Sequence, residues 1–297
     1  MYTDRNRKYN INIYAAQKYA DPGNYVIKIV RSGKASERDK KWIRALATTH
    51  KADKMRAKAE TREQSIGQYE LAISEWLALA DTLEYARAMR SMGFVFIRQK
   101  NYDKAVETFN RLLPLWKQAG DTRAEGFTHL IIGRVYDLQK DYKKSLEYNL
   151  ASLPYWIKAK DIDQESFTLM NIGNLYSYLD DKQKVDDYFG QALKKNEQSR
   201  RPSIKAVILR DYANSLIRLK DEEKAIQYFE QSLKQWQATA NKQEEAVTAV
   251  LLAKQFAEKK NKPQAIHYYK HALAIWKKLD NQIEMKTTQA NIENLNR

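Results

Sequence analysis

The residues of this chain that could do chemistry are four histidines and two short acidic runs. His267 and His271 stand four residues apart, so that on a helix both could bind one metal ion from the same face. No third ligand is placed near them, and we interpret them as exposed helix residues. The acidic runs at 186–187 and 221–223 are interpreted as a solvated surface and as a helix N-terminus, where the helix dipole favours negative charge.

The chain lacks the residues that several other kinds of site require. The chain has no Cys, which excludes disulfides, Cys-ligated zinc, iron–sulfur clusters and Cys nucleophiles. It also has no glycine-rich loop that could hold a phosphate. The sequence therefore predicts a protein that is not an enzyme, with no catalytic residue, no metal, no cofactor and no small-molecule substrate.

Composition limits the fold and the compartment. Of the 297 residues, 43% are hydrophobic, enough for a packed core, while 9 Gly and 5 Pro are too few for the many turns of a sandwich or barrel. No run of 18 apolar residues could span a membrane, and residues 1–10 are too polar and basic for a secretory signal. These features predict a cytoplasmic protein without a membrane partner.

The elements that would position any site repeat every 40 residues. A small column of Gly or Ala begins at Gly93, and a large, mostly aromatic residue follows it three positions later in each repeat. Since one aromatic type recurs at one place, we interpret the Trp column as packing between successive units. Five of the six tryptophans fall on this grid, with Asn196 in the vacant place: Trp76, Trp116, Trp156, Trp236 and Trp276.

Helix-capping residues divide each repeat into two helices. Asp or Asn recurs at the predicted start of each helix, where its side chain can accept from the backbone N–H groups of the first turn. Arg201 breaks this series, but Pro202 follows it and suits a first helical turn. Each repeat is therefore predicted to be a helical hairpin with very short turns. The predicted caps are Asp81, Asp121, Asp161, Asn241 and Asn281 for first helices, and Asn101, Asp141, Asp181, Asp221 and Asn261 for second helices.

This pattern resembles the tetratricopeptide repeat (TPR) family. A small residue followed at three by an aromatic, at twelve by Ala and at sixteen by Phe is the signature of that family, and it reads Gly93, Phe96, Ala105 and Phe109 here. The usual repeat is about 34 residues long, so this is a lengthened variant. The spacing from Trp116 to Asp121 further resembles arrays attached to bacterial caspase-like peptidases of the CHAT type. The resemblance implies a right-handed α-solenoid.

The predicted organisation has four parts. Residues 1–35 alternate as in a short β-hairpin, which either packs on the first helices or is the remnant of a larger β-sandwich, so that the chain would be a piece of a longer protein. Residues 36–80 form a degenerate first hairpin, with one helix from Ser36 to Ala59 and a second that opens at Thr61 with Gln64 as its capping partner. Residues 81–280 form five 40-residue units, and residues 281–297 form a C-terminal capping helix. The fold class is all-α, with about six TPR-like hairpins.

First helices line the concave groove in the family, so one arc of each first helix resembles a ligand surface. The helical step of 100° per residue places that arc beside the small column. Basic residues outnumber acidic ones in it, and Asn174 and Asn214 are suited to hold a peptide backbone, because an amide both donates and accepts. The predicted groove residues are Arg90, Phe94, Arg98, Phe127, Leu130, Arg134, Phe167, Met170, Asn171, Asn174, Tyr178, Arg210, Asn214, Arg218 and Lys254.

The predicted function is that of a scaffold or adaptor that binds a protein partner through an extended, acidic peptide segment. Two alternatives remain open. The chain could be the sensor or regulatory arm of a larger CHAT-type peptidase. Alternatively, it could bind nucleic acid through its N-terminal region, since residues 1–60 hold fifteen basic and six acidic side chains.

Overall fold

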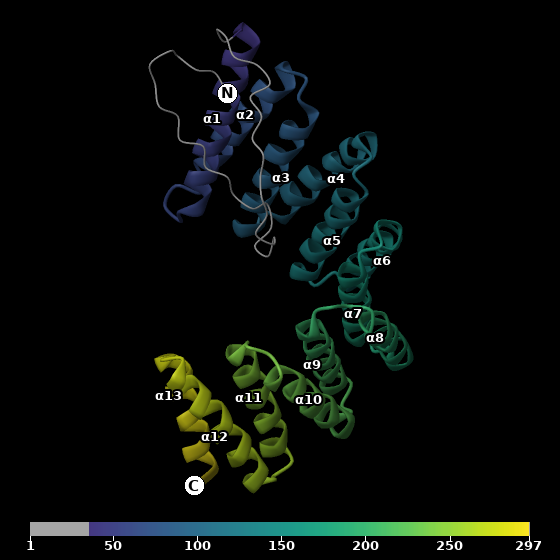
Figure 1. Cartoon of the computed structure of the whole chain (residues 1–297), viewed down its shortest axis with the longest axis vertical. Coiled ribbons are helices and arrows are strands. Elements are labelled where there is room, and N and C mark those ends of the chain that lie inside the picture. Colours follow the sequence, from purple (N-terminus) through teal and green to yellow (C-terminus); the bar gives the residue numbers. More distant parts are fainter. Residues whose placement is uncertain (1–35, 297) are drawn as a thin grey trace. The chain divides into compact units, whose positions relative to one another are not determined.

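The computed structural model describes residues 36–296, and every regular element in this part is an α-helix (Figure 1). The predicted all-α class is therefore confirmed for these residues, which contain no strand, whereas the predicted β-hairpin at 1–35 lies outside them. No described helix has the length and apolar character needed to cross a bilayer. The helices of the described part are α1 (Glu37–Ala57), α2 (Ser65–Ala78), α3 (Thr82–Arg98), α4 (Tyr102–Ala119), α5 (Thr122–Leu138), α6 (Tyr142–Ala159), α7 (Ile162–Tyr178), α8 (Lys182–Asn196), α9 (Pro202–Arg218), α10 (Glu222–Gln237), α11 (Lys242–Glu258), α12 (Lys262–Lys278) and α13 (Gln282–Asn296).

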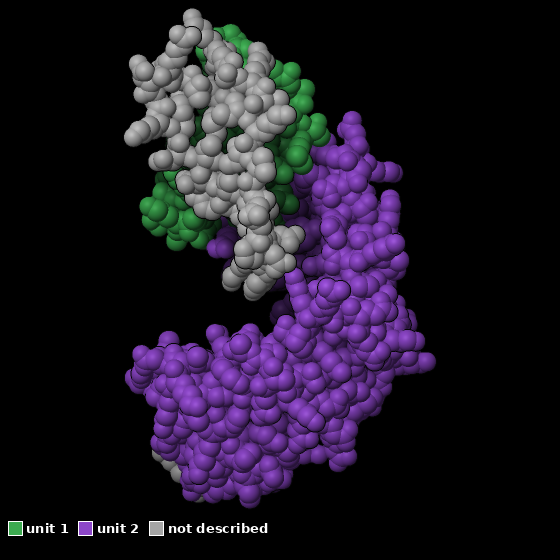
Figure 2. All heavy atoms as spheres, in the orientation of Figure 1, with its two compact units in different colours: residues 1–95 green, residues 96–297 purple. Residues whose placement is uncertain are grey.

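The chain forms two compact units, residues 1–95 and residues 96–297 (Figure 2). In the first unit, α1 and α2 pack around Tyr69 and Trp76, whose side chains are fully buried. The indole Nε1 of Trp76 donates to the Thr49 hydroxyl at 2.9 Å, and the Tyr69 hydroxyl donates to Asp53 at 2.6 Å. Each buried polar group of this pair thus finds a partner on α1, which offsets the cost of removing it from water.

The first helix agrees with its prediction and the second does not. Ser36 caps α1 in a reciprocal capping box with Asp39. The predicted start of the second helix at Thr61 is wrong, because α2 begins at Ser65. The Thr61 hydroxyl instead donates to the carbonyl of Met55 at 2.7 Å, in the turn between the two helices. The capping-box pattern was therefore present in sequence but is used for a turn.

All ten predicted caps are confirmed. In each case a side-chain oxygen accepts from the backbone N–H three residues later, over 2.9–3.4 Å. Pro202 occupies the first turn of α9, also as predicted. Since each cap is satisfied within its own first turn, helix starts in this chain are set by local chemistry.

The turns between helices use a left-handed residue. Asp or Asn caps follow directly after residues with φ between 51° and 68°, a region that costs residues other than Gly about 1–2 kcal/mol. Only one of these residues is Gly. They are Ala80, Lys100, Gly120, Lys140, Lys160, Asp180, Lys220, Lys260 and Asp280.

This turn geometry predicts opposite effects for two substitutions in the second unit. Gly120→Ala should lower the free energy of unfolding by about 1 kcal/mol, because a Cβ is unfavourable at φ 68° although no atom stands in its way. Lys140→Gly should raise it by about 0.5–1 kcal/mol, because the strain at φ 61° is relieved. Urea unfolding followed by circular dichroism measures both. Equal stability of the Gly120→Ala variant and the wild type would contradict the strain.

The tryptophans of the second unit lie between its helices. Trp116, Trp156, Trp236 and Trp276 are at most 3% exposed, so these rings pack in the core, and their role between successive units stays a prediction. The small column packs closely: a Cβ added to Gly173 would lie 2.8 Å from the ring of Phe189. A first helix and its second helix therefore approach to ring-on-backbone contact.

The last helix differs between its two sides. Thr288 and Ile292 of α13 are buried, and α13 packs on α12. Its exposed residues include Lys286, Gln289 and Glu293, which line a hollow shared with α12, and the apolar Ile283, which is 77% exposed. A terminal helix of a repeat array needs a polar outer side, and the capping role of residues 281–297 stays a prediction.

Candidate peptide-binding groove

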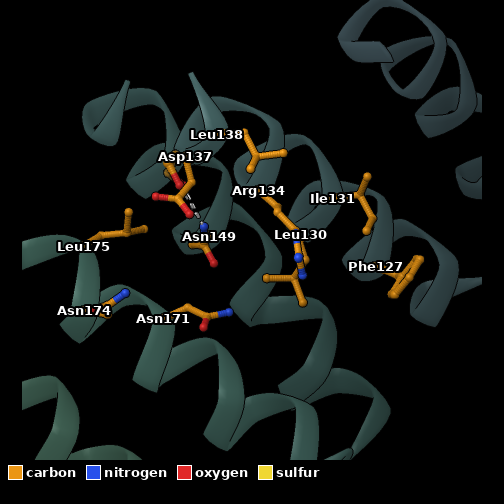
Figure 3. Close-up of a pocket in the computed structure, with 11 residues that line it drawn as sticks. Phe127, Leu130, Ile131, Arg134, Asp137, Leu138, Asn149, Asn171, Asn174 and Leu175 are labelled. Carbon is orange, nitrogen blue, oxygen red and sulfur yellow. Dashed lines mark hydrogen bonds between the residues drawn. The ribbon is translucent and has the colours of Figure 1, made fainter. Parts of the chain in front are cut away.

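A hollow of about 330 Å³ lies where α5, α6 and α7 meet (Figure 3). Phe127 stands at one end of it and Leu175 at the other, as the labelled side chains in Figure 3 show. Phe127 makes one end of the hollow apolar, while the side formed by α7 carries Asn171 and Asn174 beside Leu175. Its lining residues are Phe127, Leu130, Ile131, Arg134, Asp137 and Leu138 from α5, Ser145 and Asn149 from α6, and Asn171, Asn174 and Leu175 from α7.

A second hollow of about 450 Å³ shares Asn174 with the first. Its other lining residues come from α9, one helical hairpin further along the chain. Because Asn174 borders both hollows, they lie next to each other over α5, α7 and α9. The α9 residues that line it are Asp211, Asn214, Ile217 and Arg218.

Asn174 and Arg218 form the polar centre of this surface. The side-chain oxygen of Asn174 accepts from the Ser215 hydroxyl at 3.1 Å and from the Arg218 guanidinium at 3.4 Å. That guanidinium also bonds to the Ser177 hydroxyl and stacks 3.9 Å from the centre of the Tyr178 ring. With its oxygen engaged, Asn174 has its NH₂ group left to donate to a guest.

Carboxylates accompany the arginines of the groove. Partial burial raises the pKa of Asp137, against the opposing effect of Arg134 and Arg218. Deeper burial likewise raises the pKa of Asp211, against Arg210 and Arg218. Each carboxylate thus lies in a place where a charged form is costly unless a cation stands beside it.

The charge of Arg210 is paired within the protein. Its side chain is 17% exposed, forms an ion pair with Glu244 of α11, and lies 6.0 Å from the centre of the Trp236 ring. The net positive charge beside the hollows is therefore smaller than the sequence predicts for the arc, because Glu244 of the next hairpin pairs with Arg210. Arg134, by contrast, is exposed, and its charge acts on Asp137 of the same helix.

The structure brings together part of the predicted residue set. Hydrophobic and amide members line the two hollows with Arg134 and Arg218, and Tyr178 supports Arg218 from behind. Met170 does not contribute a surface: it is 6% exposed and belongs to the core, as Phe167 does in part. Eight predicted residues line neither hollow: Phe167, Met170, Tyr178 and Arg210, together with Arg90 and Phe94 in the first unit and the exposed Arg98 and Lys254.

Sequence reasoning missed Asn149. Its side chain is 4% exposed, lines the first hollow, and donates to the Ser145 carbonyl at 2.8 Å. The signal was available, because Asn149 stands in a column that otherwise holds Phe109, Phe189, Phe229 and Tyr269. A single amide in an aromatic column marks a place where the interior is open to a polar surface.

The histidine pair lies apart from this groove. His271 contacts Glu245 at 2.9 Å, and His267 meets the Tyr268 ring edge-on at 5.1 Å. Over residues 36–296, no three His, Asp or Glu side chains come together as a metal site would require.

The profile of the tetratricopeptide repeat family matches residues 84–158 and 205–278, about half of the chain. Among solved structures, the apo form of RapI is 16% identical with a TM-score of 0.61, and the match covers 86% of this chain and 98% of that one. A Signal Transduction ATPase with Numerous Domains from Pyrococcus horikoshii, which has a tetratricopeptide repeat sensor, is 17% identical with a TM-score of 0.60; the match covers 82% of this chain and 38% of that one.

A Rap protein complexed with Competence and Sporulation Factor is 12% identical with a TM-score of 0.52, and the match covers 88% of this chain and 75% of that one. At these identities the likeness shows the fold. No curated protein matches the chain.

Proposed function

The chain belongs to the tetratricopeptide repeat family, and we propose that it is a non-catalytic adaptor that holds an extended peptide segment of a partner protein along α5, α7 and α9. The observation that carries this proposal is that the two hollows adjoin at Asn174. An extended peptide presents a donor or an acceptor at each residue, and amide side chains can meet both. Asn171, Asn174 and Asn214 supply such groups along the surface.

We propose that the guest is acidic or ends in a carboxylate. Arg134 supports this, because it is exposed and lines the first hollow, where its charge also acts on the Asp137 carboxylate. An arginine can bind a carboxylate through two parallel hydrogen bonds. Phe127 and Leu130, at the apolar end of the same hollow, would take a hydrophobic side chain of the guest.

A second role, as the sensor arm of a larger signalling protein, draws support from the P. horikoshii ATPase, whose tetratricopeptide repeats form its sensor. This role would use the same groove, so that the two differ in what the chain is attached to. The nucleic-acid alternative, the CHAT association and a cytoplasmic location stay predictions from sequence.

Selection from a random-peptide display library tests the adaptor proposal. We expect the protein to enrich acidic peptides, and Arg134→Glu to weaken binding of a selected peptide about tenfold or more, since a favourable charge contact becomes a repulsive one. Asn174→Ala should weaken binding of the same peptide regardless of its charge. Fluorescence anisotropy with the labelled peptide measures both affinities.

Lys234→Glu is the matched control, because it makes the same charge change on the exposed side of α10, outside both hollows. It should bind like the wild type. Equal binding by Arg134→Glu and Lys234→Glu would contradict the site. Enrichment of peptides no more acidic than the library would contradict the acidic class of guest.

A further inference from the structure

The junction after α8 departs from the other junctions of the second unit. Asn196 occupies the place that tryptophan holds in the other second helices, and α8 ends at this residue. The helices α4, α6, α10 and α12 each continue past their tryptophan. The turn that follows also lacks the left-handed residue found in most of the other turns.

The next helix is seated differently at this junction. Elsewhere in the second unit, a first helix packs on the second helix before it, as α5 does on α4, α7 on α6 and α11 on α10. Helix α9 instead packs more extensively on α7 than on α8. Among α5, α7, α9 and α11, the pair α7 and α9 is alone in making broad contact between successive first helices.

The missing ring coincides with this different seating of α9. Where a tryptophan is present, it fills the space beside the first helix of its own hairpin: a Cβ at Gly126 would stand 3.0 Å from the Trp156 ring. An Asn side chain is too short to fill that space, and protein interiors do not keep such voids. This junction is also the one at which α9 contacts α7.

Asn196 acts here through its size. Its side chain is 5% exposed, and its Nδ2 makes no hydrogen bond to the described residues. A buried amide without a partner costs free energy, so the residue is not explained by a bond that it makes. Because Asn196 replaces a tryptophan, no indole stands at the junction where the first helices α7 and α9 meet.

The close approach of α7 and α9 builds the polar centre of the groove. Ser215 and Arg218 of α9 reach the oxygen of Asn174 on α7, at 3.1 Å and 3.4 Å. The Arg218 guanidinium also lies on the Tyr178 ring of α7. Without the α7–α9 approach, these side chains would have no reason to meet, and the two hollows would not share a wall.

We propose that Asn196 is a positioning residue for the peptide groove: by leaving out the indole of its column, it lets α9 settle on α7 and so assembles the Asn174–Arg218 centre. The inference rests on the proposed function for its role in binding, but the helix approach itself can be tested without any ligand. Asn196 lies in the core, so its effect on a guest is transmitted through helix position alone.

Distances between spin labels test the approach. The chain has no native cysteine, so pairs of introduced cysteines label only the chosen sites. The exposed turn residues that follow the first helices give matched pairs: Asp180 with Lys220 reports on α7 and α9, and Lys140 with Asp180 reports on the regular junction before it. Electron–electron double resonance then measures each distance in the wild type and in Asn196→Trp.

In the wild-type protein, the 180–220 distance should be shorter than the 140–180 distance. Asn196→Trp should lengthen the 180–220 distance toward the regular value and leave the 140–180 distance unchanged. Asn196→Leu, a smaller change, should lengthen it less and serves if the Trp variant does not fold by circular dichroism. Wild-type distances that are equal, or a 180–220 distance that neither folded variant alters, would overturn the inference.

Binding forms the second readout, with the library-selected peptide as the probe. We expect Asn196→Trp to weaken its binding about tenfold, comparable to the loss of one well-placed polar contact. A lengthened 180–220 distance with unchanged affinity would overturn the role of Asn196 in the groove. If the wild type selects no peptide, the adaptor proposal fails, and the distances alone decide whether Asn196 sets the junction.

Discussion

Replacing Trp156 by alanine is expected to lower the free energy of unfolding by about 3–5 kcal/mol. The indole is 2% exposed and lies against the backbone of Gly126, where a Cβ would come within 3.0 Å of the ring. Neither helix can close over the space that the ring leaves, because each is held by its own cap and by its neighbours. The loss therefore combines the transfer free energy of the ring with the cost of a cavity.

Urea unfolding followed by far-ultraviolet circular dichroism measures this loss, and Ile157→Ala is the matched control. Ile157 is the next residue of α6 and is 54% exposed, so its truncation should cost less than about 1 kcal/mol. A stacked array can unfold in parts, so the loss should appear first in the hairpins around α6. Equal losses in the two variants would show that the Trp column does not hold the units together.

Much of the fold could be predicted because its determinants are local. The ten Asp and Asn caps act within one helical turn. Since the sequence repeats every 40 residues, residues of one column pack in the same kind of environment in each unit. The predicted start of α2 was wrong for a reason that is also local. Thr61 and Gln64 match a capping pattern, but the Thr61 hydroxyl has a nearer partner in the Met55 carbonyl.

The side of each helix that carries the candidate site residues could be predicted from the sequence, but the contacts that their side chains make with other helices could not. The helical step correctly placed Arg134, Asn171 and Asn174 toward one surface, because it depends only on the helix that carries them. It could not show that Glu244 neutralises Arg210, or that Met170 turns into the core, because both depend on how a neighbouring hairpin packs. Net charge counted along one helix therefore overestimates the charge that a guest would meet.

Asn196, which stands where the repeat otherwise has tryptophan, also shows what the sequence alone cannot predict. The period alone marks it as an exception. Only the contacts of α9 with Asn174 and Tyr178 show that the exception falls beside the polar centre of the groove. A departure from a repeat is thus visible in sequence, while its consequence depends on which helices it brings together.

Adding one methyl group at Gly173 is expected to lower the free energy of unfolding by about 1–3 kcal/mol. The new Cβ would lie 2.8 Å from Cδ2 and 3.0 Å from Cε2 of the Phe189 ring, which is fully buried. That ring cannot retreat freely, because its other face stacks on Tyr212 of α9 with centroids 4.6 Å apart. The strain of Gly173→Ala would therefore reach across the junction into the next hairpin.

Gly190→Ala makes the same chemical change one residue after Phe189 and should have the opposite sign. Gly190 lies inside α8 with no atom within 4 Å of an added Cβ, so alanine there should raise the free energy of unfolding by about 0.5–1 kcal/mol through its better helix propensity. Urea unfolding of both variants measures the pair. If Gly173→Ala were also stabilising, the ring of Phe189 would have room to move, and the close packing of α7, α8 and α9 around it would be wrong.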